Sequence, residues 1–123
     1  MCKDREKIDV LANVAGVMDA FAAADVYKDD EWDKVIGVNL TVPTRMIRAV
    51  LPIMKSKKHG SIINISSKAG LSGASAGLAY TASKHGLVSS VLLGKTPFET
   101  DIIFVARCNK THSLAIPPRW NPL

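Results

Sequence analysis

Tyr80 and Lys84 lie four residues apart in a segment whose pattern predicts a helix, so their side chains should emerge on one face, about 5–6 Å apart at Cβ. A phenol loses its proton only near about pH 10, but a neighbouring ammonium favours the phenolate. The pair could therefore exchange a proton with a substrate alcohol or carbonyl. Surface pairs at helix starts show the same spacing, so this hypothesis depends on further residues.

Ser67 follows a short apolar segment that is predicted to be a strand. Open α/β sheets bind ligands at the carboxyl ends of their strands. A hydroxyl at such a position could donate a hydrogen bond to a reacting carbonyl oxygen and stabilise the charge that develops there. An ordinary turn serine, in a loop rich in serine and glycine, is the alternative interpretation.

Asn39 interrupts the apolar face of a long predicted helix, on the same side as Trp32, Ile36 and Met46. A polar side chain on a buried face requires hydrogen-bond partners. Pro43 has no N–H, so the carbonyl of Asn39 loses its helical partner. The freed carbonyl and the amide could together hold a water molecule. A kinked helix with a satisfied asparagine explains the residue equally well.

Apolar periodicity predicts the elements that would carry these residues. A strand is expected over 8–13, a helix over 29–58, a strand over 61–66 and a second helix over 78–93. Strand and helix alternate, which is typical of parallel βαβ units with right-handed crossovers. The sequence therefore predicts an α/β fold.

The composition is that of one globular domain: 123 residues, of which 47% are hydrophobic and 22% charged. The net charge is +5, but the densest basic run, 55–59, lies at an expected helix C-terminus, where cations complement the helix dipole. A patch for nucleic acid or acidic lipid is the weaker alternative, and no nucleic-acid partner is expected. Cys2 and Cys108 lack a metal-ligand spacing, so no metal site is expected. Without an apolar signal or spanning segment, the sequence predicts no membrane partner and a cytoplasmic location.

Four motifs occur in the order and spacing of the short-chain dehydrogenase/reductase family, which the chain resembles. Ser67 precedes Tyr80 by thirteen residues, a separation common in that family. The similarity extends over residues 8–88, about two thirds of the chain. The motifs are Asn13-Val14-Ala15-Gly16, Asn39, Ser67 and Tyr80-Thr81-Ala82-Ser83-Lys84.

The resemblance implies hydride transfer between NAD or NADP and a carbonyl or secondary alcohol. By matching position, Tyr80 would be the general acid/base and Ser67 would orient the substrate oxygen. Lys84 would favour the Tyr80 phenolate and bind the nicotinamide ribose, and Asn39 would hold a water that links Lys84 to solvent. The residues expected to contact the cofactor, with the first three on its adenosine side, are Asn13, Ala15, Gly16, Tyr80 and Lys84.

Two features depart from the family pattern. The sequence contains no glycine-rich turn of the form Thr-Gly-x-x-x-Gly-x-Gly, so the expected fold is a truncated Rossmann-type, doubly wound parallel sheet. Residues 1–95 are interpreted as a partial catalytic domain of the family. Residues 96–123 are interpreted as a divergent C-terminal segment, in which a strand could form over 102–108 before an irregular tail.

These departures leave two functions open. The first is an oxidoreductase that acts on a small-molecule carbonyl or alcohol and is impaired or inactive as this chain alone. The alternative is a non-catalytic truncated module that associates through its two long helices. In the family, the helices equivalent to 29–58 and 78–93 commonly form the subunit interface, so a homo-oligomer is expected. A fragment or mis-spliced product with an incomplete core is a third interpretation.

Overall fold

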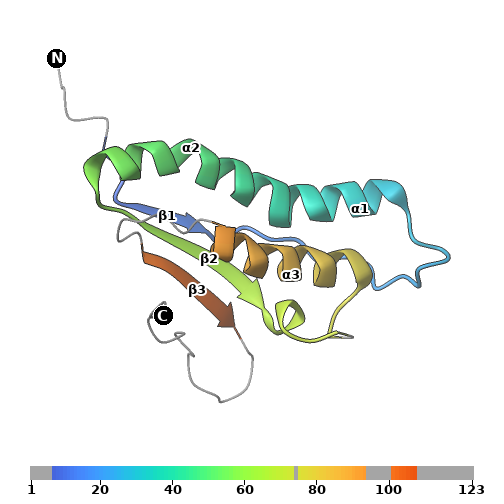
Figure 1. Cartoon of the computed structure of the whole chain (residues 1–123). Helices are drawn as coiled ribbons and strands as arrows, with labels where there is room; N and C mark the ends of the chain where they lie inside the picture. Colours follow the sequence, from blue (N-terminus) through green and yellow to red (C-terminus); the bar gives the residue numbers. More distant parts are fainter. Residues whose placement is uncertain (1–6, 74, 94–100, 108–123) are drawn as a thin grey trace.

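Three parallel strands form one sheet in the order β1-β2-β3 (Figure 1). The computed structural model describes residues 7–73, 75–93 and 101–107. The strands are β1 (Val10–Asn13), β2 (Ser61–Ser67) and β3 (Asp101–Arg107). In the register, Ser61 lies opposite both Val10 and Asp101. Strand β3 begins and ends one residue before the expected 102–108, and Cys2, Cys108 and the expected tail lie outside the described residues.

Strand β2 is the centre of the sheet and divides its side chains between two faces. Ile62, Asn64 and Ser66 are buried on one face, and the residues between them are only half-buried. Ile62 packs with Val50 and Met54 of the helix that precedes the strand, and these three residues form the apolar cluster of the core. The buried face of β2 is therefore the face that the helices cover.

One continuous helical segment connects β1 to β2 (Figure 1). It consists of α1 (Asp29–Ile36), a π-helical turn (Gly37–Thr41) and α2 (Val42–Lys57). Three carboxylates in the first turn of α1 complement the helix dipole. Lys58 ends the segment in the left-handed conformation, with φ 54°. The predicted helix over 29–58 is confirmed, except that it contains the π-helical turn and ends one residue earlier.

The predicted apolar face of this helix was wrong in two positions. Trp32 is 37% exposed and Met46 is 43% exposed, whereas Asn39 is fully buried. The π-helical turn is the physical reason, because its Val42 N–H donates to the carbonyl five residues earlier and the turn holds more residues than an α-helical one. Trp32, Asn39 and Met46, which are seven residues apart, therefore do not share one face as they would in a regular helix.

A short 3₁₀ turn (Lys68–Gly70) joins β2 to the loop before α3 (Leu78–Leu93). Helix α3 packs against β2 and β3 and alongside α1. The Ser66 hydroxyl, from the buried face of β2, donates to the main-chain carbonyl of Lys84 at 3.2 Å. Gly70 is buried beside this contact, so the backbone of the turn approaches α3 closely.

We expect Gly70→Ala to destabilise the chain by about 1–3 kcal/mol, the usual cost of overpacking. A Cβ at position 70 would lie 2.5 Å from the Ser66 Oγ and 2.8 Å from the Lys84 carbonyl oxygen. Urea unfolding measures the effect. Gly73→Ala is the matched control, because no atom lies within 4 Å of the added methyl. Equal stability of the two variants would contradict the close packing of the turn on α3.

Candidate active site

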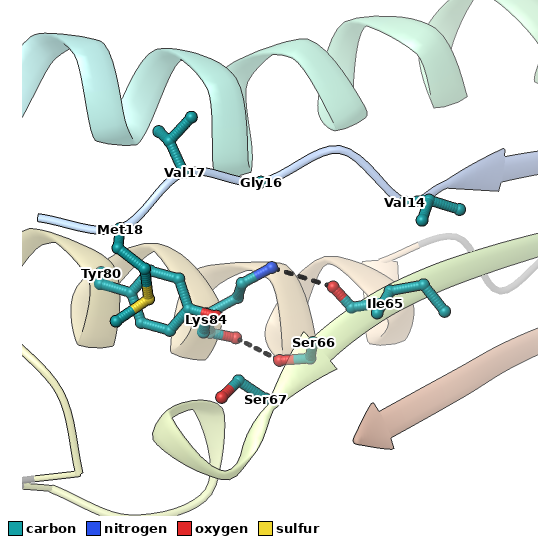
Figure 2. Close-up of a pocket in the computed structure, with 9 residues that line it drawn as sticks. All are labelled: Val14, Gly16, Val17, Met18, Ile65, Ser66, Ser67, Tyr80 and Lys84. Carbon is teal, nitrogen blue, oxygen red and sulfur yellow. Dashed lines mark hydrogen bonds between the residues drawn. The ribbon is translucent and has the colours of Figure 1, made fainter. Parts of the chain in front are cut away.

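A pocket of about 300 Å³ lies at the carboxyl ends of β1 and β2 (Figure 2). Its walls come from the segment after β1, the end of β2 and the first turns of α3. Such an edge is the usual ligand site of an open parallel sheet. Four of the residues expected from the sequence line it with five others: Gly16, Ser67, Tyr80 and Lys84, and then Val14, Val17, Met18, Ile65 and Ser66.

Lys84 is the buried cation of the pocket. Only 3% of the residue is exposed, and its Nζ donates a hydrogen bond to the Ile65 carbonyl at 3.0 Å. The same ammonium lies 5.5 Å from the centroid of the Tyr80 ring, within the range of a cation–π interaction. Burial lowers the pKa of Lys84, because desolvation penalises its charged form. The helical spacing predicted from the sequence thus brings the ammonium and the phenol ring together.

Ser67 presents its hydroxyl to the pocket from the last position of β2. Its Oγ accepts a hydrogen bond from the Ala69 N–H at 3.2 Å and caps the 3₁₀ turn that follows. This contact uses a lone pair and leaves the hydroxyl proton to donate. A neutral donor at the end of the strand therefore lines the same pocket as Tyr80 (Figure 2).

Asn39 does not line the pocket but lies directly behind it. Its Oδ1 accepts from the Val17 N–H at 2.8 Å, and its Nδ2 donates to the Val17 carbonyl at 2.9 Å and to the Ser83 Oγ at 3.1 Å. The side-chain amide is therefore satisfied by protein groups. A Cβ on Gly16 would lie 3.4 Å from the Lys84 Nζ and 3.5 Å from the Asn39 Oδ1, so Gly16 separates the asparagine from the pocket.

Asn13 and Ala15 lie apart from the other predicted site residues. They line a smaller pocket of about 160 Å³, between the end of β1 and the π-helical turn, together with Val38 and Pro43 among others. The Asn13 Nδ2 donates to the Asn64 Oδ1 at 2.7 Å, which joins β1 to β2. The two pockets share Val14, and the structure thus distributes the predicted cofactor residues over adjacent hollows.

Sequence reasoning missed two polar residues that contact the main chain of Tyr80. The Asp19 Oδ2 accepts from the Tyr80 N–H at 2.9 Å, and the Ser83 Oγ donates to the Tyr80 carbonyl at 2.8 Å. Ser83 had a signal in the sequence, because it lies on the helix between Tyr80 and Lys84. The signal for Asp19 was weak: it is one of two acids, with Asp25, in a loop composed mainly of small and apolar residues.

Two features are absent from the described part of the chain: a group of metal ligands and a membrane-spanning helix. No group of three or more potential ligands from His, Cys, Asp and Glu is found there. No helix in the same residues has the length and apolar character needed to span a bilayer.

Comparison with known proteins gives one consistent family. The family model of short chain dehydrogenases matches residues 1–105. The short-chain dehydrogenase/reductase cdmF of Talaromyces verruculosus is 60% identical over 82 residues, which are 67% of this chain and 32% of that protein. The chain thus spans about a third of the length of this curated relative.

Solved structures show the same likeness in three dimensions. A metagenomic short-chain oxidoreductase in complex with NADP superposes with a TM-score of 0.67 and 39% identity, over 80% of this chain and 46% of that one. A 4-hydroxyisoleucine dehydrogenase in complex with NADH gives a TM-score of 0.62 and 37% identity, over 68% and 37%. The predicted Rossmann-type α/β fold is confirmed, and the described residues form part of it. The chain belongs to the short-chain dehydrogenase/reductase family.

Proposed function

We propose that this chain carries the catalytic centre of an NAD(P)-dependent oxidoreductase that interconverts a carbonyl and a secondary alcohol. The observation that supports this most directly is that Ser67, Tyr80 and Lys84 line one pocket at the carboxyl ends of parallel strands. A phenol can transfer a proton to a carbonyl oxygen, a hydroxyl can donate a hydrogen bond to that oxygen, and a nearby ammonium favours the phenolate. The relatives named above, two of them bound to NADP or NADH, belong to the same family.

The proton chemistry rests on Tyr80 and Ser67. In reduction of a ketone, the Tyr80 phenol would give its proton to the substrate oxygen, and in alcohol oxidation the phenolate would take it back. The Ser67 hydroxyl would donate a hydrogen bond to the same oxygen as negative charge develops. The Ser67 rotamer supports this role, because its Oγ is already held by the Ala69 N–H.

The residues present fit a nicotinamide cofactor, which when bound supplies or accepts the hydride. The Lys84 ammonium has three donor hydrogens, and the one hydrogen bond that it makes among the described residues is to the Ile65 carbonyl. Its remaining donors could bind ribose hydroxyls. A Cβ on Gly16 would lie 3.4 Å from the Lys84 Nζ, so the glycine leaves space beside the ammonium. Asn13 and Ala15, in the adjacent hollow, would line the adenosine side.

Asn39 would take part through its main chain. Its side-chain amide is occupied by Val17 and Ser83, so the carbonyl is the group left to bind a water. Pro43 has no N–H to donate to that carbonyl. A water at this position would lie behind Lys84 and could return its proton to solvent during turnover.

We expect Tyr80→Phe to lower kcat for hydride transfer by about 100-fold or more, the usual contribution of a general acid/base. The affinity for the nucleotide should change little, because the ring remains. The assay follows the absorbance of NADPH or NADH with a panel of ketones and secondary alcohols. Ser89→Ala removes an exposed hydroxyl of α3 that lies outside the pocket and serves as the control. Undiminished turnover in Tyr80→Phe would refute the role of the phenol.

The lowered pKa of Lys84 should be visible in stability as a function of pH. Between that pKa and the unfolded value of 10.5, the folded chain has released the proton and the unfolded chain still holds it. Stability therefore rises with pH in this window, by about 1.4 kcal/mol for each pKa unit of lowering. Thermal unfolding of wild type and Lys84→Met from neutral pH to 10.5 should show the rise in the wild type alone. A parallel rise in Lys84→Met would contradict this origin, and Lys68→Met is the exposed control.

Assembly of copies of this chain is the finer proposal for its partners. Val42 and Met46 are exposed one turn apart on α2, at 50% and 43%, and an apolar pair at this spacing suits a helix interface. Sedimentation velocity should show a dimer or larger species whose population falls in Met46→Lys. Thr44→Lys adds the same charge at a neighbouring exposed position. A monomer at all concentrations would refute the interface, whereas assembly without nucleotide binding would favour the non-catalytic module.

A further inference from the structure

Asp19 is a buried carboxylate that none of the roles above uses. It lies in the segment between β1 and α1 and is 5% exposed. Its Oδ2 accepts from the Tyr80 N–H at 2.9 Å and from the Tyr27 hydroxyl at 3.5 Å. Its Oδ1 has no hydrogen-bond partner among the described residues. Burying a carboxylate in this setting is costly unless hydrogen bonds compensate for its lost hydration.

The interaction that compensates for this cost lies at the start of α3. The first amides of a helix have no partners within it, and a carboxylate there satisfies them and complements the dipole. Gly77, the residue before α3, accepts the Thr81 N–H at 2.9 Å but has no side chain to cap the helix. Asp19 supplies that cap from a distant segment. A Cβ on Gly77 would overlap the Asp19 carboxylate, so the glycine and the aspartate fit as a pair.

The capped residue is the one that carries the phenol. Asp19 holds the amide of Tyr80, and the Ser83 hydroxyl donates to its carbonyl. Ser83 in turn accepts from the Asn39 Nδ2, and Asn39 is bonded to the backbone of the segment that carries Asp19. The backbone of Tyr80 is therefore fixed on both sides by the segment after β1, and the direction of its side chain follows from that backbone.

We propose that Asp19 is a positioning residue for Tyr80: its carboxylate caps α3 and sets the place of the phenol relative to Ser67 and Lys84. This proposal rests on the proposed oxidoreductase function for its catalytic consequence. The cap itself can be measured without turnover. A role of this kind predicts that an uncharged acceptor at position 19 retains most of the effect, because Asn keeps an oxygen that can accept the Tyr80 N–H.

Amide hydrogen exchange tests the cap directly. Chain labelled with ¹⁵N-tyrosine shows two amide signals, one from each tyrosine, and a Tyr27→Phe sample assigns them. In Asp19→Ala the Tyr80 amide should exchange about ten- to hundredfold faster, the loss expected for a hydrogen bond to a charged group. Asp19→Asn should retain most of the protection. Gly77→Ala, which displaces the carboxylate without removing it, should resemble Asp19→Ala. Asp25→Ala, an exposed acid of the same segment, is the control, and thermal unfolding of each variant corrects for global stability.

Kinetics then separate positioning from mere structural support. We expect kcat to fall by about ten- to hundredfold in Asp19→Ala, with KM for NADPH unchanged and with recovery in Asp19→Asn. Unchanged exchange at Tyr80 in both Asp19→Ala and Gly77→Ala would overturn the cap. Faster exchange with undiminished kcat would overturn the positioning role. A wild-type chain that transfers no hydride would refute the proposed function instead, and the exchange data would still decide whether Asp19 holds the Tyr80 amide.

Discussion

The buried amide of Asn39 is the interaction on which the rest of the site depends. It binds the N–H and the carbonyl of Val17 and the hydroxyl of Ser83, so one side chain joins the segment after β1, the π-helical turn and α3. Pairing matters at this depth, since an unpaired buried polar group costs about 1–3 kcal/mol. The N–H and the carbonyl of Val17 and the hydroxyl of Ser83 must therefore all lie within hydrogen-bond distance of this amide. These bonds fix the distance between the segment after β1 and α3, which form two walls of the pocket.

The π-helical turn is the local departure from α-helical geometry that places the Asn39 amide on the buried side. In a regular helix, Asn39 would share a face with Trp32 and Met46, which lie seven residues to either side. With the extra residue of the turn, Asn39 is buried and these two residues are exposed. Pro43 suits this geometry, because it lacks the N–H that a regular helix would need there. Turns of this kind are frequent at functional sites. Here the irregular backbone and the buried polar side chain of Asn39 occur together, because the turn orients that side chain.

Consecutive side chains at the end of β2 have different roles, because they point alternately to the two faces of the sheet. Ser66 points to the helix side and donates to the Lys84 carbonyl, while Ser67, one position on, lines the open pocket. The strand also contributes the Ile65 carbonyl, which accepts from the Lys84 ammonium. Three consecutive residues thus hold the α3 backbone, its cation and a hydroxyl donor in fixed relation. A shift of one residue in register would turn every side chain of the strand to the opposite face and break the Ser66 contact with α3.

Local periodicity allowed the sequence by itself to determine the order of strands and helices, the common face of Tyr80 and Lys84, and the place of Ser67 at a strand end. Each of these depends on neighbours within a few residues. Only the tertiary structure decided that Asp19 meets the Tyr80 amide, 61 positions away, and that the amide of Asn39 bonds to protein rather than to water. Neither could be read from the chain, because hydrogen bonds between distant segments are set by how the helices pack on the sheet, and no short spacing in the sequence records that packing.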